Sequence, residues 1–174
     1  MDEQQMTTPY KSPLCATLAD LPETELVPAK YLTGGSIGAQ IAYGQESSIM
    51  TATRQPGYHT KPHTHAAEQM NYVLSGELFI FVGDDGFLAH EGDIFRIPKD
   101  AVHWSHVSGT GPCVLLEVHA PSLIGDPGVI DTATPLLTDE EKRDMSSIQK
   151  IESIWPDDID RDAIEARVMK RLGY

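Results

Sequence analysis

The sequence has little cysteine and no long apolar run. Only Cys15 and Cys113 occur among its 174 residues, which excludes a disulfide framework and makes buried or idle thiols the expectation. The longest uninterrupted apolar run, residues 78–82, is far shorter than the roughly 20 residues that a membrane-spanning helix needs. Residues 1–5 are acidic and polar, and no apolar block follows them, so we expect no secretory signal and a cytoplasmic protein.

Positive charge is also scarce. The chain has 13 Lys or Arg against 26 Asp or Glu, a formal net charge of −13. Nucleic acids and anionic membranes are therefore unfavourable partners, because their phosphates would meet net like charge. A hydrophobic fraction of 40% with 22% charged residues is typical of a globular domain that buries its own core.

Three segments of the chain differ in their pattern. Residues 1–24 carry several prolines among polar residues without a sustained period, which indicates an extended N-terminal arm. Residues 25–120 hold a series of short β-type runs separated by Gly, Pro and Asp, at a spacing typical of an all-β sandwich or barrel. These runs are residues 26–32, 37–43, 48–53, 69–74, 77–82, 86–89, 93–97 and 114–119. Residues 121–174 form a helical extension.

Two α-helices are predicted in this C-terminal extension. The first begins with the capping-box sequence at residues 138–141 and continues as a stripe of apolar residues at positions 145, 148 and 151. The second begins near Asp160, presents apolar residues on one face, and ends at Gly173. We expect these helices to cover the outside of the barrel or a contact between subunits.

Three histidines within the β-region have the spacing of metal ligands. His63 and His65 are two residues apart on an expected strand, so both side chains point the same way, about 6.6 Å apart along the strand. A turn at residues 66–67 would let Gln69 offer its carbonyl oxygen, and His103 follows a turn at residues 98–100. The expected ligand set is three nitrogens and one oxygen. Glu68 would face the opposite side of its strand, so we place it outside the cavity.

In these residues the chain resembles the cupins. The first cupin motif, G-x5-H-x-H-x3-E-x6-G, is matched by Gly57, His63, His65, Gln69 and Gly76. The second motif, G-x5-P-x-G-x2-H-x3-N, is matched by Gly92, Pro98 and His103, with Asp100 for the second Gly and Val107 for the Asn. Asp tolerates a left-handed turn, so the change at position 100 is mild. The resemblance implies a double-stranded β-helix, the cupin jelly-roll barrel, with a metal site.

Gln69 stands where most cupins have Glu, and the site therefore keeps the full charge of a divalent ion. Three imidazoles and an amide suit Fe(II), which we favour, and also Mn(II), Ni(II), Co(II) or Zn(II). A site at +2 holds an enolate, catecholate or carboxylate more tightly than a site at +1. Four protein ligands leave positions open for substrate, water or dioxygen, which argues for catalysis.

Other polar residues are candidates for roles beside the ion. By strand parity His59 and Lys61 share the face of His63 and His65, which would place them at the barrel mouth to move a proton or hold an anion. The alternative is that both lie in solvent at the start of the strand. Glu117 is a candidate general base or partner of a ligand histidine, and it needs a partner of its own if it is interior. His119 shares its face.

The resemblance leaves three functions open. The favoured one is a non-haem Fe(II) dioxygenase that cleaves a C–C bond of a small anionic or enolisable substrate. The second is a redox-neutral isomerase or lyase acting on a sugar acid or a similar molecule, in which Glu117, Lys61 or Tyr72 moves the proton. The third is a small-molecule-binding cupin without catalysis. Cupins commonly dimerise through sheet edges or swapped N-terminal strands, so the resemblance also implies a homodimer.

Overall fold

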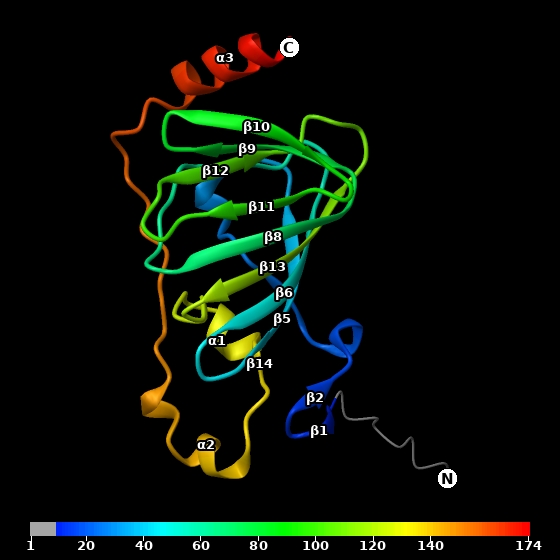
Figure 1. The fold of residues 1–174 in the computed structure, drawn as a ribbon, viewed down its shortest axis with the longest axis vertical. Coiled ribbons are helices and arrows are strands. Elements are labelled where there is room, and N and C mark those ends of the chain that lie inside the picture. Colours follow the sequence, from blue (N-terminus) through cyan, green and yellow to red (C-terminus); the bar gives the residue numbers. More distant parts are fainter. Residues whose placement is uncertain (1–9) are drawn as a thin grey trace.

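The computed structural model describes residues 10–174 as two β-sheets that face each other, while residues 1–9 of the predicted arm lie outside the described residues (Figure 1). One sheet has five strands in the order β10-β9-β12-β7-β4. The other has seven, in the order β11-β8-β13-β6-β5-β14 with β3 paired to β5. The predicted all-β jelly-roll barrel is confirmed.

The strands are short. The five-stranded sheet comprises β4 (Leu32–Gly34), β7 (His59–Thr60), β9 (Glu77–Val82), β10 (Asp85–His90) and β12 (His103–His106). The seven-stranded sheet comprises β3 (Glu23–Glu25), β5 (Ile37–Tyr43), β6 (Ser48–Arg54), β8 (Glu68–Ser75), β11 (Ile94–Ile97), β13 (Cys113–Ala120) and β14 (Thr134–Pro135). A separate hairpin pairs β1 (Tyr10–Ser12) with β2 (Cys15–Ala16).

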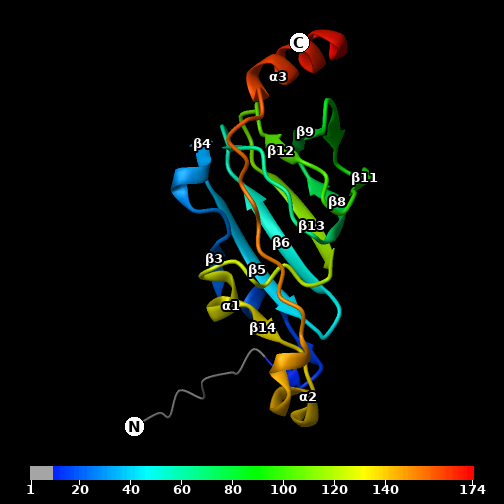
Figure 2. The same cartoon turned by 90° about the vertical axis from the view of Figure 1, so that its left-hand side faces the viewer.

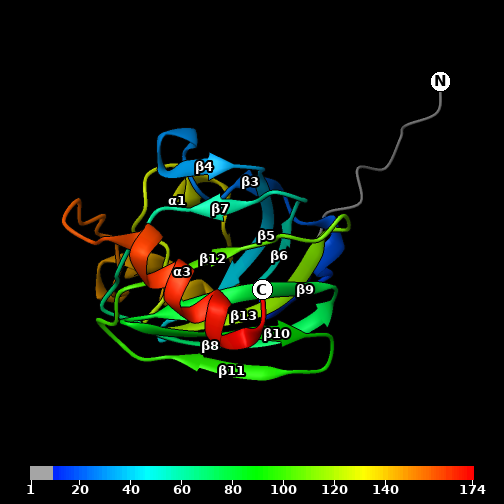
Figure 3. The ribbon, with the colours of Figure 1, turned by 90° about the horizontal axis from the view of Figure 1, so that it is seen from above.

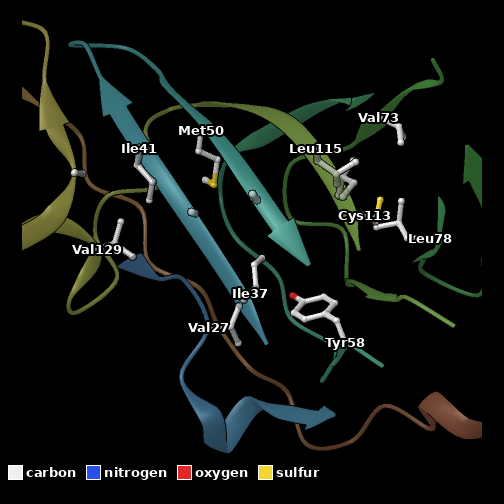
Figure 4. Close-up of a cluster of buried hydrophobic side chains, with 14 of the residues drawn as sticks. Val27, Ile37, Ile41, Met50, Tyr58, Val73, Leu78, Cys113, Leu115 and Val129 are labelled. Atoms are coloured by element: carbon white, nitrogen blue, oxygen red, sulfur yellow. The ribbon is translucent and has the colours of Figure 1, made fainter. Parts of the chain in front are cut away.

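Alternation along β6, β8, β11 and β13 of the large sheet separates the barrel interior from its outer face. In β8 the side chains of Gln69, Asn71 and Val73 are buried, whereas those of Met70 and Tyr72 are exposed. Because successive strand residues point to opposite faces, alternation gives β8 one interior and one exterior side. The inward apolar side chains of both sheets form the main core, part of which Figure 4 shows.

Strand β9 breaks this alternation because both of its faces are covered. Leu78 and Ile80 belong to the main core, while Phe79 and Phe81 belong to a second apolar cluster with helix α3 (Arg161–Leu172). Figure 3 shows α3 lying across β9, β10 and β12. The long apolar run of the sequence is therefore a strand buried on both faces.

Helix α3 confirms the second predicted helix. The Asp160 side chain caps its N-terminus by accepting a hydrogen bond from the Ala163 amide at 3.1 Å. Gly173 ends it in the left-handed conformation, with φ of 91°. Ile164 and Val168 are buried against the sheet, as the spacing predicts.

The first predicted helix is much shorter than expected. The capping box formed by Thr138 and Glu141 is present, but α2 covers only Asp139–Arg143 and is followed by a 3-10 turn, η3 (Met145–Ser147). Ile148 and Ile151 are nevertheless buried, because an extended segment lays them on the barrel instead of a helix. We call residues 148–160 the strap; Figure 2 shows the segment between α2 and α3 running along the barrel.

The remaining helical segments are short. They are η1 (Leu18–Asp20), η2 (Ala29–Tyr31) and α1 (Val129–Thr132). In the described part of the chain, no helix is both long and apolar enough to cross a membrane.

Candidate metal centre

Three histidines from two segments of the barrel, residues 63–65 and strand β12, lie close together. His63 and His103 form an isolated antiparallel bridge, with N···O distances of 3.0 and 2.8 Å between their backbones. The turn at residues 98–100 fixes the backbone of His65, because the Asp100 amide donates to the His65 carbonyl oxygen at 3.0 Å. Asp100 adopts φ of 63°, the left-handed conformation that the sequence predicts there. The side chains of His63, His65 and His103 place ligand atoms within 4.8 Å of one another.

The backbone fixes the tautomer of all three rings. Nδ1 of His63 lies 3.3 Å from the Lys61 carbonyl oxygen. Nδ1 of His65 lies 3.0 Å from that of Ala67, and Nδ1 of His103 lies 2.9 Å from that of Ala101. A carbonyl oxygen only accepts, so each Nδ1 carries the hydrogen and each Nε2 keeps a free lone pair. The three Nε2 atoms are therefore available as ligands.

All three imidazoles are held in the neutral form. Burial, together with the neighbouring His65, lowers the pKa of His103 to about 3. Burial also lowers the pKa of His63 well below its usual value, with contributions from His103 and His65. The pKa of His65 is lowered by burial, against the opposing effects of the Ala67 carbonyl and the Gln69 side chain. Neutral histidines bind a cation without first releasing a proton at pH 7.

Gln69 is buried and held by two acceptors. Its amide nitrogen donates to Oδ1 of Asn71 at 2.7 Å and to Oε2 of Glu117 at 2.9 Å. Both amide hydrogens are thereby used, which leaves the carbonyl oxygen as the free atom of the side chain. Glu68 lies on the outer face and pairs with Arg96 at 2.5 Å, as predicted for a residue outside the cavity.

Glu117 is interior and has the partner that an interior carboxylate requires. Its Oε1 lies 2.7 Å from Nη2 of Arg54, and the side chains are only 2% and 7% exposed. Arg54 is a residue that the sequence analysis missed, because the pairing joins β6 to β13 and is not visible in local spacing. The signal that could have found it is parity, since Arg54 shares the inward side of β6 with Met50 and Ala52.

These residues line a cavity of about 440 Å³ inside the barrel. The polar part of its wall contains the three histidines, Gln69, Asn71, Glu117, His119, Arg54 and Tyr58, and the apolar part includes Ile80, Phe95, Ile97 and Leu115. His119 is buried, and burial together with the nearby His65 lowers its pKa to about 3. The cavity thus combines a group of neutral nitrogen ligands with space for a small organic molecule.

The strap forms the roof of this cavity. The Trp155 ring stacks on Tyr31, with centroids 4.0 Å apart, and on His63 at 4.6 Å. The backbones of Ile154 and Thr64 exchange hydrogen bonds of 2.8 and 2.9 Å. The strap therefore covers the candidate ligand His63 directly.

His59 and Lys61 do not lie at the barrel mouth, where strand parity placed them. β7 ends at Thr60, because Pro62 cannot donate to a strand ladder and interrupts the regular alternation. Lys61 is exposed, and neither residue lines the cavity. The cavity-lining lysine is Lys30.

The His59 side chain instead joins α3 to the barrel. Its Nε2 donates to Oε1 of Glu165 at 2.7 Å, and the indole of Trp104 donates to the same oxygen at 2.7 Å. His106 stacks on His59 with centroids 4.5 Å apart. These residues could also approach a cation, but the guanidinium of Arg161 lies 3.6 Å from Glu165 and would repel one. We interpret the cluster as a clasp for α3.

The clasp should loosen in acid. Burial raises the pKa of Glu165. The hydrogen bonds from His59 and Trp104 and the charge of Arg161 lower the pKa by more than burial raises it, so the net shift is downward. A carboxyl group whose pKa is lowered by folding stabilises the fold at pH values above the ordinary carboxyl pKa. This contribution is lost as the pH falls through the lowered pKa. We expect α3 to become cleavable by limited proteolysis once the pH falls below the ordinary carboxyl pKa, and Glu165→Gln to show the same susceptibility at pH 7. Equal resistance of the variant and the parent at pH 7 would contradict the clasp.

The donor set fits a divalent transition metal. Nε2 of His65 is buried and has no hydrogen-bond partner among the described residues, which is costly unless another group meets it. Three neutral imidazoles and an amide oxygen are ligands that suit Fe(II), Zn(II), Ni(II) or Co(II).

Comparisons with known proteins agree with this fold. The sequence model of a family described as a cupin domain matches residues 50–119. Comparison with curated proteins gave no match. A cupin-like protein from Thermotoga maritima is 14% identical, with a TM-score of 0.52 over 82% of this chain and 91% of that one. The polyketide cyclase RemF from Streptomyces resistomycificus is 20% identical, with a TM-score of 0.52 over 61% of this chain and 78% of its own. Residues 50–119, the segment that carries the candidate ligands, therefore match a cupin domain, and the fold is that of a cupin-like protein.

Proposed function

We propose that the protein is a metal-dependent enzyme that acts on a small anionic or enolisable molecule inside the barrel, as an Fe(II) dioxygenase that cleaves a C–C bond. The observation that supports the proposal best is the convergence of three neutral histidines, each with Nε2 free, on a roofed cavity of about 440 Å³. His63, His65, His103 and the carbonyl oxygen of Gln69 would hold the ion. When bound, Fe(II) supplies Lewis acidity toward substrate oxygens and the electrons that dioxygen requires.

The protein residues favour a negatively charged substrate. All four ligand side chains are neutral, so none of the charge of the ion is cancelled by its ligands. Glu117 does not cancel it either, because its charge is matched by Arg54 at 2.7 Å. A substrate anion therefore enters a site with an uncompensated positive charge.

The walls of the cavity exclude water from the reacting atoms. Phe95, Ile97 and Leu115 are buried apolar side chains on the wall, and Trp155 covers His63 from the roof. In such a water-poor space electrostatic attraction is stronger than in bulk solvent.

A second candidate is a redox-neutral isomerase or lyase. It is supported by the proton-exchanging groups on the same wall, namely Glu117, Tyr58 and His119. Burial is the largest cause that raises the pKa of Tyr58, and it outweighs the lowering effect of Arg54, so the phenol is a proton donor at neutral pH. Such groups serve enolisation, in which a proton leaves one carbon and returns to another.

Oxygen consumption distinguishes the two candidates. We would purify the protein without chelators, determine its metal content, load it anaerobically with Fe(II), and screen catechols, β-diketones and keto acids at an oxygen electrode. Oxygen uptake that requires both Fe(II) and substrate supports the dioxygenase. Turnover without oxygen supports the isomerase or lyase, and metal binding without any turnover in a wider screen would overturn both.

The replacement Gln69→Glu should make metal binding depend on pH. The new carboxylate would face Oε2 of Glu117 and Oδ1 of Asn71, the two acceptors that now bind the Gln69 amide. Repulsion and burial would raise the pKa of the new carboxyl group, so that it stays protonated near neutrality. Below that raised pKa, metal affinity should fall about tenfold for each pH unit. Titration calorimetry with Zn(II) between pH 6 and 8 measures this slope.

The double variant Gln69→Glu/Glu117→Gln is the matched control. Its amide at position 117 can donate to the carboxylate at position 69, which restores a hydrogen bond with the roles exchanged. We expect most of the pH dependence to disappear in this variant. An equally flat profile for Gln69→Glu alone would show that residue 69 does not contact the ion.

A further inference from the structure

The outer face of the seven-stranded sheet carries an unusual number of exposed apolar side chains. We call the outward side chains of β6, β8, β11 and β13 the outer apolar face. Its most exposed members are Ile94 at 69%, Met70 and Leu74 at 41%, Tyr72 at 40% and Ile49 at 38%. Isolated exposed apolar residues are normal, but a contiguous group of them marks an interaction site.

The strand register makes this group contiguous. Ile94 lies opposite Tyr72, which lies opposite Leu116, in a row across β11, β8 and β13. A second row places Met70 opposite Val118, and Val118 opposite Ile49 on β6. Directly opposite residues on one face of a sheet are in side-chain contact. Figure 1 shows these four strands side by side.

The outer apolar face is also electrically neutral. The charged residues among the outward positions of its strands are Glu68 and Arg96, which pair with each other at 2.5 Å. The whole chain carries a formal charge of −13, so the excess negative charge lies on other surfaces. A strongly acidic partner can approach this face without meeting like charge.

We propose that the outer apolar face is the interface between two copies of this chain. A standard interface buries about 800 Å² on each partner, more than the five most exposed side chains supply alone. The half-buried Val114, Leu116 and Val118 and the Glu68–Arg96 pair enlarge the contact toward that size. Two sheets that pack face to face lie about 10 Å apart, so the same face on both copies would interdigitate around a two-fold axis.

This interface differs from the ones that the sequence analysis considered, which were the sheet edges and the N-terminal arm. In the structure the arm-side strand β3 is paired with β5 of its own chain, and η1 also contacts β5. The outer apolar face therefore predicts a dimer whose stability does not depend on Leu14 or on other exposed residues of the arm.

The substitution Tyr72→Glu tests the proposal at the centre of the face. In a symmetric interface it brings two new negative charges into a desolvated contact, so the dimer dissociation constant should rise at least tenfold. We would compare sedimentation velocity of the parent and the variant across a range of micromolar concentrations. The matched control is Leu14→Glu, which makes the same charge change at an apolar residue that is 59% exposed outside the face.

The expected result is a dimeric parent, a monomeric Tyr72→Glu variant with an unchanged melting temperature, and a dimeric Leu14→Glu variant. Ile94→Glu, at the most exposed position, replaces Tyr72→Glu if that variant fails to fold. A monomeric parent would overturn the proposal. So would a dimer that survives both substitutions on the face, or one that is lost only with Leu14→Glu, which would assign the contact to the arm.

Discussion

Replacement of His65 by alanine is expected to abolish stoichiometric metal binding while the barrel stays folded. His65 contributes a buried Nε2 that lacks a hydrogen-bond partner among the described residues, so its removal deletes a candidate ligand, together with the hydrogen bond from Nδ1 to the Ala67 carbonyl oxygen. The core rests on apolar burial on both sides of the barrel, which the substitution does not touch. We expect metal affinity to fall by more than about 100-fold.

Metal analysis by mass spectrometry and circular dichroism check this expectation together. His90→Ala is the matched control, since His90 is a histidine that is 59% exposed and distant from the cavity wall. It should keep the metal content of the parent. His63→Ala and His103→Ala should behave like His65→Ala, and a metal content near one per chain in any of the three would remove that residue from the ligand set.

Replacement of Glu117 by alanine should have the largest effect on stability. Burial on its own would lower the pKa of Arg54, and the Glu117 carboxylate reverses that effect, so the net shift is upward. Without Glu117 a buried guanidinium remains, two of whose nitrogens already lack a partner among the described residues. Removal of one partner of a buried pair lowers the free energy of unfolding by about 3–5 kcal/mol. Urea denaturation measures the change.

Glu68→Ala supplies the comparison for this experiment. It removes the carboxylate of an exposed ion pair on the same sheet, with side chains 45% and 55% exposed. The free energy of unfolding should fall by less than about 1 kcal/mol. Glu117→Ala should also weaken metal binding about 10- to 100-fold, because the Gln69 amide loses an acceptor that orients it. Equal losses of stability in the two variants would contradict the buried ion pair.

The sequence predicted those parts of the site that depend on local spacing. His63, His65 and Gln69 lie within seven residues of one another, and the turn at Asp100 that brings in His103 is itself local. Strand parity predicts that Glu117 and His119 share one face of their strand, and the structure shows that this face is interior. Such features are determined by a few consecutive residues, so a single sequence contains them.

The features that could not be predicted depend on long-range packing. Arg54 meets Glu117 across 63 positions of sequence, and no local pattern couples them. His59 turns toward Glu165 because Pro62 interrupts its strand and because α3 lies against that face. Apolar residues at positions 145, 148 and 151 have helical spacing and predict a helix into the start of the strap, whereas the barrel buries Ile148 and Ile151 along an extended chain.

Different segments of the chain supply the candidate ligands and the mouth of the cavity, so the mouth can change among related barrels while the ligands stay the same. The candidate metal ligands and the residues that hydrogen-bond to them all lie within the matched segment, residues 50–119. The mouth and roof come from outside it, from residues 26–31 on one side and from the strap with residues 123–127 on the other. Insertions and replacements there leave the strands that carry the ligands untouched. Two proteins with identical ligands can therefore admit different molecules, and transplanting residues 148–160 between relatives is a direct route to altered selectivity.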